Sequence, residues 1–144
     1  MNMKGRLLCI AVAFVVAVSG CSQQDVYSPL DHTDKSITVP IGNRGLTGEL
    51  KRVLKEHGWR LVVDRGPEVT EASGSRTERF DTFKTRYRLI TESRQTDYAM
   101  DFSPYLSYEL AIIDNQSGQE VFALSGSDSQ RQVLTRFKKF VQGK

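Results

Sequence analysis

The chain has 144 residues, 39% hydrophobic and 26% charged, which fits one globular domain with short extensions. Its 20 Lys and Arg exceed its 17 Asp and Glu by a formal +3, a margin too small to predict a nucleic-acid partner. The two cysteines, Cys9 and Cys21, lie within or directly after an apolar N-terminal run. The rest of the sequence therefore predicts neither a disulfide nor a thiolate metal site.

The N-terminus has the layout of a secretory signal sequence. Lys4 and Arg6 precede an uncharged apolar run over residues 7–18, which is shorter than the roughly 20 residues that span a bilayer. The run ends in a hydrophobic residue, two small residues and a cysteine: Val18, Ser19, Gly20 and Cys21. This ending resembles the lipobox of bacterial lipoproteins.

The resemblance implies that residues 1–20 are removed as a signal peptide and that Cys21 becomes the acylated first residue. The alternatives are an ordinary signal peptide followed by a chance cysteine, or a single membrane-spanning anchor. Ser22 stands where enteric bacteria usually place Asp to retain a lipoprotein in the inner membrane. We therefore expect a lipid anchor in the outer membrane, with the protein on the periplasmic face. Loss of Lys4 and Arg6 would lower the net charge to about +1.

The mature chain divides into a tether and a domain. Residues 21–36 are polar and show no periodicity, so we expect a flexible tether that begins at the lipidated Cys21. Residues 37–144 are expected to fold alone as a single α/β domain. Alternating apolar residues over 37–41 predict a short strand, with Pro40 at its end or on a sheet edge.

Two amphipathic helices and several strands are predicted within the domain. The first helix carries an apolar stripe at helical spacing and ends at Gly58; the stripe comprises Leu46, Leu50, Val53, Leu54 and His57. Its other face carries Glu49, Lys51, Arg52, Lys55 and Glu56. The second stripe comprises Val133, Leu134, Phe137, Phe140 and Val141. A capping box formed by Ser127 and Gln130 is predicted ahead of it.

Period-2 patterns predict further strands over residues 59–64, 83–89, 105–113 and 121–124. Residues 70–82 are expected to be a loop, residues 94–97 a polar break, and residues 114–118 a hairpin turn. This order predicts an α+β fold: a two-layer α/β sandwich in which a mixed or antiparallel sheet of about five strands carries two helices on one face.

The sequence contains few residues at spacings typical of catalytic or metal-binding sites. His32 lies in the expected tether and His57 at a helix end, so neither has a nucleophile or a ligand partner at a useful spacing. Gly42, Gly45 and Gly48 open a helix but match neither the dinucleotide fingerprint nor the P-loop. The sequence therefore predicts a protein that is not an enzyme and that uses no cofactor or metal.

Two sets of side chains are candidates for contact with a partner. Lys84, Arg86 and Arg88 alternate with packed residues and would form a basic strand face. This face would meet an anionic glycan, lipid phosphates or an acidic protein, or it would simply be the solvated side of the strand. The second set is an aromatic cluster that we expect to be half buried: Tyr98, Phe102, Tyr105 and Tyr108.

Two stretches resemble a group of small envelope lipoprotein domains. Residues 46–54 and 58–65 are similar to their helix that ends in glycine before an apolar strand, and residues 110–122 are similar to their Asp-to-Gly hairpin. The group includes penicillin-binding-protein activators, the N-terminal domain of the Tol–Pal propeller protein, and export lipoproteins of the curli and exopolysaccharide systems. Residues 66–82 replace a second long helix of these domains with a loop-like sequence, which also admits the smaller lipopolysaccharide-assembly lipoprotein and secretin- or pilus-associated lipoproteins.

The resemblance implies a non-enzymatic outer-membrane lipoprotein that serves as an accessory or assembly component of a cell-envelope machine for secretion, conjugation, pilus assembly or polymer export. The alternative is a regulator that docks on a periplasmic enzyme such as a peptidoglycan synthase, or a lipopolysaccharide-assembly lipoprotein. Either function requires the membrane, through the N-terminal lipid, and a protein partner in the envelope. The sequence leaves open whether the domain is monomeric or associates with itself.

Overall fold

The computed structural model describes residues 24–143 apart from residues 27, 67, 73–74 and 80–83. The predicted signal peptide, Cys21 and Phe83 lie outside the described residues.

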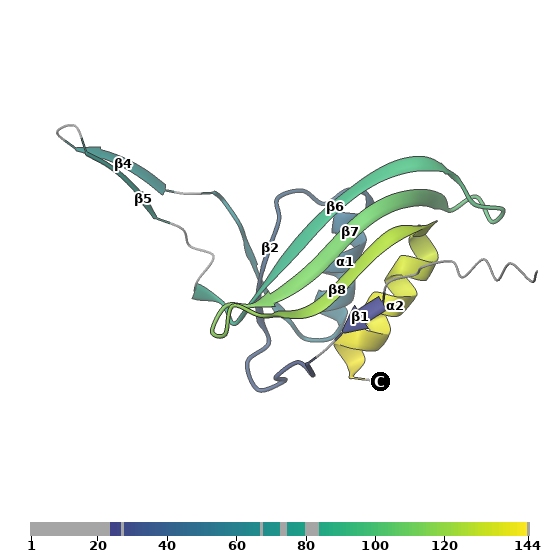
Figure 1. Ribbon diagram of the computed structural model, residues 1–144, viewed down its shortest axis with the longest axis horizontal. Coiled ribbons are helices and arrows are strands. Elements are labelled where there is room, and N and C mark those ends of the chain that lie inside the picture. The colour runs from purple at the N-terminus through teal and green to yellow at the C-terminus, as the bar shows by residue number, and fades with distance from the viewer. Residues whose placement is uncertain (1–23, 27, 67, 73–74, 80–83, 144) are drawn as a thin grey trace, which may run out of the picture.

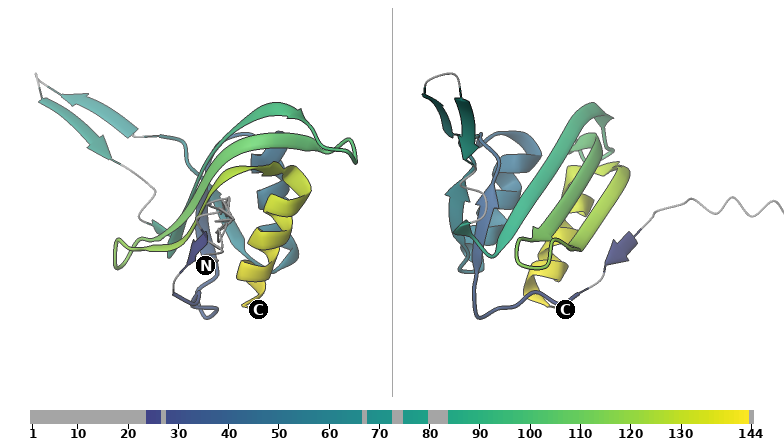
Figure 2. Two further views of the ribbon diagram at one scale, coloured as in Figure 1. Left: turned by 45° about the vertical axis from the view of Figure 1, so that its right-hand side comes forward. Right: turned by 60° about the vertical axis from the view of Figure 1, so that its left-hand side comes forward.

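A mixed sheet packs against two helices that lie on the same face of it (Figures 1 and 2). The sheet has the strand order β1-β8-β7-β6-β2-β3. The elements are β1 (Gln24–Val26), β2 (Ser36–Val39), α1 (Gly45–Glu56), β3 (Arg60–Val63), β6 (Tyr87–Tyr98), β7 (Pro104–Asp114), β8 (Glu120–Ser129) and α2 (Gln130–Gln142). β2 is parallel to both of its neighbours, whereas β6, β7, β8 and β1 pair in antiparallel fashion. The predicted two-layer α+β sandwich is confirmed.

The first half of the domain follows the predicted strand, helix and strand closely. The stripe residues Leu46, Leu50 and Leu54 are buried beneath the sheet, and His57 is the C-cap of α1. Gly58 then adopts a φ of 79°, a left-handed conformation that costs glycine little and returns the chain into β3. β3 lies at one edge of the sheet, parallel to β2.

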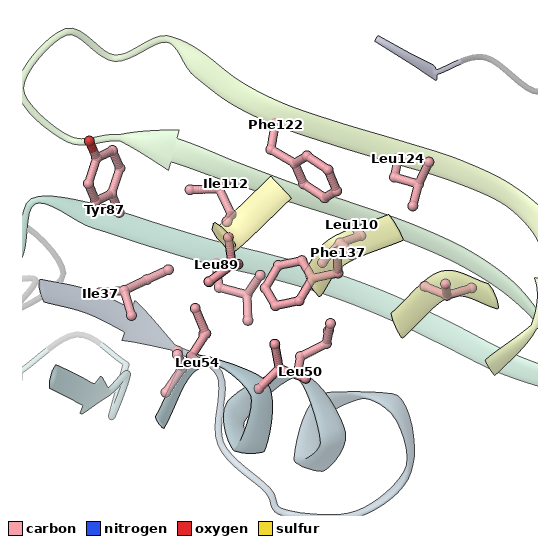
Figure 3. Packing of buried hydrophobic residues seen from close by; sticks show 14 of the residues in the cluster. Ile37, Leu50, Leu54, Tyr87, Leu89, Leu110, Ile112, Phe122, Leu124 and Phe137 are labelled. Carbon is pink, nitrogen blue, oxygen red and sulfur yellow. The ribbon is translucent and has the colours of Figure 1, made fainter. Parts of the chain in front are cut away.

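The second half supplies the rest of the core. Side chains on one face of β7 alternate into it, and Phe137 of α2 packs against them (Figure 3). The ring centroid of Phe122 lies 5.8 Å from that of Phe137 in an edge-to-face contact and 4.4 Å from that of Phe140 in a stack. Both helical stripes therefore bury their apolar faces against a single sheet.

Two expected irregular segments are strands in the structure. β4 (Glu68–Ala72) and β5 (Ser75–Arg79) form a separate antiparallel hairpin that projects from the sheet, where the sequence predicts a loop (Figure 1). β6 continues through residues 94–97, the predicted polar break, and pairs with β7 as far as Tyr98. Backbone pairing does not require apolar side chains, so a polar stretch can remain a strand beside a well-packed neighbour.

The expected tether contributes to the fold. β1 pairs with β8, Leu30 is buried in the core, and the backbone N–H of Asp31 donates to the Tyr87 hydroxyl at 2.7 Å. The ordered part of the chain therefore begins before residue 37, the predicted domain boundary.

Two local predictions about the helices are wrong. Ser129, not Ser127, is the N-cap of α2, and its Oγ accepts a hydrogen bond from the backbone N–H of Gln132. Lys51, expected on the solvent face of α1, is buried, and its Nζ donates to the Gly42 carbonyl. Burial lowers the pKa of Lys51, and the charge of Lys55 acts in the same direction.

Candidate functional surfaces

The predicted basic face is not a uniform row of solvated cations. Lys84 is exposed and precedes β6, whereas Arg88 is half buried and its Nε makes no hydrogen bond. Arg86 has 20% of its side chain exposed and forms an ion pair with Asp114, Nη2 to Oδ2, at 2.8 Å. Any role of these three residues in partner binding stays a prediction.

Arg86 has a structural task at the β7–β8 turn. Its Nη1 donates to the Gln116 side chain, and its guanidinium carbon lies 5.5 Å from the centre of the Tyr87 ring. Although burial opposes its charge, the hydrogen bond and negative charge of Asp114 raise the pKa of Arg86. Charge reversal at Arg86 would therefore disturb the fold as well as any docking face.

The predicted aromatic cluster separates into a buried part and an exposed part. Tyr108 is buried in the core and Tyr105 is half buried. Tyr98, Met100 and Phe102 have exposed fractions of 64%, 103% and 87%. We call these last three side chains the apolar tip; they lie at the β6–β7 turn (Figure 1).

The apolar tip stands on a defined turn. The Ala99 N–H donates to the Ser103 carbonyl at 2.8 Å, and the Phe102 N–H donates to the Ala99 carbonyl at 2.9 Å. Oδ1 of Asp101 accepts hydrogen bonds from the N–H and the hydroxyl of Ser103. Its Oδ2 lies 3.1 Å from Nη1 of Arg131, which joins the turn to the start of α2.

The hydrogen bonds from Ser103 lower the pKa of Asp101, and Arg131 acts in the same direction. The turn therefore holds its carboxylate charged while it presents its apolar side chains to solvent. The sequence analysis identifies Tyr98 and Phe102 as candidate contact residues. It misses Met100, because a single methionine forms no recognisable pattern.

Strands β6, β7 and β8 line a polar depression of about 320 Å³. It is lined by Glu92, Ser93, Arg94, Ser107, Tyr108, Glu109 and Ser125. Glu92 and Glu109 are direct partners in the β6–β7 register, an arrangement of like charges that weakens a sheet.

The two histidines lie apart from any catalytic arrangement. Nδ1 of His57 donates to the Val53 carbonyl at 2.8 Å, and Nε2 accepts from the Gln142 side chain at 3.0 Å. His57 is thus a helix-end residue, as the sequence indicates, and it also links α1 to α2. His32 is exposed.

Within the described part of the chain, no group of three or more His, Cys, Asp or Glu side chains could hold a metal ion. None of the helices described is both long enough and apolar enough to cross a membrane.

No family model matches the chain, and no curated protein matches it either. Among solved structures, the chain is similar to a PelC variant from Paraburkholderia phytofirmans, solved as a dodecamer, with 15% identity and a TM-score of 0.48 over 83% of this chain and 93% of that one. A second PelC dodecamer from the same organism gives 13% identity and a TM-score of 0.44 over 84% and 91% of the two chains.

Proposed function

We propose that this protein is a lipid-anchored, non-enzymatic accessory component of a cell-envelope machine, held in the outer membrane through acylated Cys21 and facing the periplasm. The observation that carries the proposal is the position of the lipobox-like sequence. Val18 to Cys21 end only two residues before β1, which belongs to the sheet of the domain. The anchor would therefore attach almost directly to the domain.

The permanence of such an anchor follows from its chemistry. Each buried methylene of a lipid chain contributes roughly 0.8 kcal/mol, and two or more chains give stable attachment where one chain binds only marginally. A mature lipoprotein cysteine carries two or three chains in the group that the sequence resembles. The domain would then work at the membrane surface and meet partners that assemble there.

The surfaces of the domain support a binding role. His57 serves a helix end and Asp114 a turn, while the apolar tip is exposed. Exposed apolar side chains gathered at one turn are typical of contact sites.

Metabolic labelling with a palmitate analogue, followed by membrane fractionation, tests the proposal. The wild-type protein should incorporate label and sediment with the outer membrane, whereas Cys21→Ser should do neither. Cys9→Ser is the matched control, because it also removes a cysteine of the apolar run but leaves the lipobox intact. Label that persists in Cys21→Ser would contradict the anchor.

The accessory role is tested on the same strains. Mild detergent extraction and native electrophoresis should place the wild-type protein in a complex of defined composition, and Cys21→Ser should lose that complex. A wild-type protein that migrates alone, or that turns over a substrate after purification, would contradict the role.

A further inference from the structure

The apolar tip is built to display its side chains rather than to bury them. Tyr98 is the last residue of β6, and Met100 and Phe102 follow in the turn. The β7–β8 pairing ends at Tyr105 with Ser129, so the turn extends beyond the last rung that β8 shares with β7. The β6–β7 turn lies at one end of the sheet (Figure 2), and its three large apolar side chains are exposed there.

The backbone conformation of Phe102 strengthens this point. Its φ of 61° is in the left-handed region, which costs a residue with a Cβ roughly 1–2 kcal/mol and which Gly or Asn adopts more readily. Its ring is 87% exposed and contributes little to the core. The phenylalanine side chain therefore stabilises neither the turn nor the core, and this points to a contact outside the domain.

The direction of β1 indicates which end of the sheet would face the lipid anchor. In the antiparallel register Gln24 pairs with Leu124 and Val26 with Phe122. The N-terminal end of β1 therefore faces the end of the sheet where β8 reaches Ser129 and where the apolar tip lies. The opposite end of the sheet carries the turn at residues 114–118 (Figure 1).

Simple lengths place the tip at or beyond the level that the anchor can reach. Cys21 is three residue steps before Gln24, which limits their separation to about 10 Å. The five residue steps of β8 from Leu124 to Ser129 cover about 17 Å in the same direction, and the apolar tip lies beyond them. A bilayer that holds the lipid of Cys21 would thus be within reach of the tip.

We propose that the apolar tip (Tyr98, Met100 and Phe102) inserts into the interfacial layer of the leaflet that holds acylated Cys21 and so gives the domain a second, orienting contact with phospholipid. The inference rests on the lipid anchor of the proposed function. Tyrosine is enriched where bilayer and water meet, and Phe and Met supply apolar area to the acyl boundary. Asp101 lies between Met100 and Phe102 but is paired with Arg131 at the start of α2, so a shallow insertion leaves this charge pair at the headgroup level.

A single-cysteine probe tests the contact on the full-length lipoprotein. Cys9 is lost with the signal peptide and Cys21 is acylated, so Met100→Cys carries one free thiol for an environment-sensitive fluorophore. Ser117→Cys is the matched control, because Ser117 is also exposed in a hairpin turn but at the opposite end of the sheet. Both proteins are purified from membranes, labelled and reconstituted into vesicles of phosphatidylethanolamine and phosphatidylglycerol, with and without a spin-labelled lipid quencher.

The probe at position 100 should shift to the blue and be quenched several-fold more than the probe at position 117. Adding Phe102→Asn to Met100→Cys should reduce the quenching, because it removes the neighbouring apolar side chain.

Three results would overturn the inference, and they differ from one another. Vesicles that float without bound protein would contradict both the lipid anchor and this inference. Vesicles that carry both proteins but quench the two probes equally would remove the tip contact and leave the anchor intact. A blue shift at position 100 that no lipid quencher affects would show that the tip meets a second copy of the chain instead.

Discussion

Arg86 Nη2 lies 2.8 Å from Asp114 Oδ2, and this ion pair joins the residue before β6 to the last residue of β7. The same carboxylate accepts the backbone N–H of Gln116 at 2.8 Å and so closes the turn into β8. One partly buried charge pair therefore sets both the start of the β6–β7 pairing and the geometry of the following turn. This explains why Arg86, predicted as part of a solvated basic row, turns inward.

Removal of the Arg86 guanidinium should destabilise the fold. We expect Arg86→Ala to lower the thermal midpoint, because it leaves the buried Asp114 carboxylate without its cation. Arg65→Ala, which removes an exposed arginine in the loop after β3, should leave the midpoint near that of the wild type. Circular dichroism melts of the three proteins measure the difference, and equal midpoints would contradict the structural role.

The same pair should make stability depend on pH. Although burial acts against the charge, the hydrogen bonds from Gln116 and Arg86 lower the pKa of Asp114 below its ordinary value. A carboxyl with a lowered folded-state pKa stabilises the fold fully above its unfolded-state pKa of about 3.9, and this stability is lost as pH falls through the folded-state value.

Denaturant titrations across the acid range measure this dependence. Asp114→Asn should be less stable than the wild type at neutral pH, and the difference should narrow as the pH falls below about 4. A difference that stays constant down to the lowest pH would show that the charge of Asp114 does not contribute.

The core can be tested at Phe137, whose side chain is fully buried between α2 and the sheet. Phe137→Ala should cost about 3–5 kcal/mol of the free energy of unfolding, because it removes apolar contacts and leaves a cavity. Lys138→Ala, next to it on the exposed face, should change stability by no more than about 0.5 kcal/mol. Urea denaturation measures both changes in the free energy of unfolding. Similar losses for the two variants would contradict the assignment of Phe137 to the buried face of α2 and Lys138 to the exposed face.

Periodic patterns in the sequence predict the elements that one buried face defines. The apolar stripe from Leu46 to Leu54 is buried, as its helical spacing predicts. Leu106 and Tyr108 occupy alternate positions of β7 and are also buried. The polar end of β6 is missed because its residues carry no alternation and owe their conformation to the pairing with β7. The β4–β5 hairpin is missed for a related reason, since its sequence is mostly polar and charged and carries no apolar alternation.

The candidate surfaces are harder to predict than the fold, because they depend on contacts between distant residues. The sequence gives no sign that Arg86 pairs with Asp114, or that the Lys51 amine reaches the Gly42 carbonyl. Exposure of Met100 beside Phe102 appears only once β6 and β7 are known to extend past the end of β8.

The N-cap of α2 is a position where the sequence and the structure predict different serines. Ser129 caps α2, whereas Ser127, the predicted cap, lies within β8. Ser129→Ala should therefore cost about 0.5–2 kcal/mol of stability, and Ser127→Ala should cost much less. The reverse order in chemical denaturation would restore Ser127 as the cap.

A last prediction concerns the stability of the apolar tip. Phe102→Asn should leave the free energy of unfolding unchanged or raise it by up to about 1 kcal/mol, because the lost ring is exposed and Asn adopts the left-handed backbone with less strain. Phe102→Val keeps an apolar side chain but places a β-branched residue at a φ of 61°, so it should lose about 1–3 kcal/mol.

Urea denaturation with an unchanged slope would measure both effects on the same footing. If Phe102→Asn proved as damaging as Phe102→Val, the ring itself would stabilise the turn, and a reason for the phenylalanine would exist inside the domain. If only Phe102→Val is damaging, the fold needs the conformation of residue 102 but not its aromatic side chain. That result would leave the ring free for contact with a surface outside the protein.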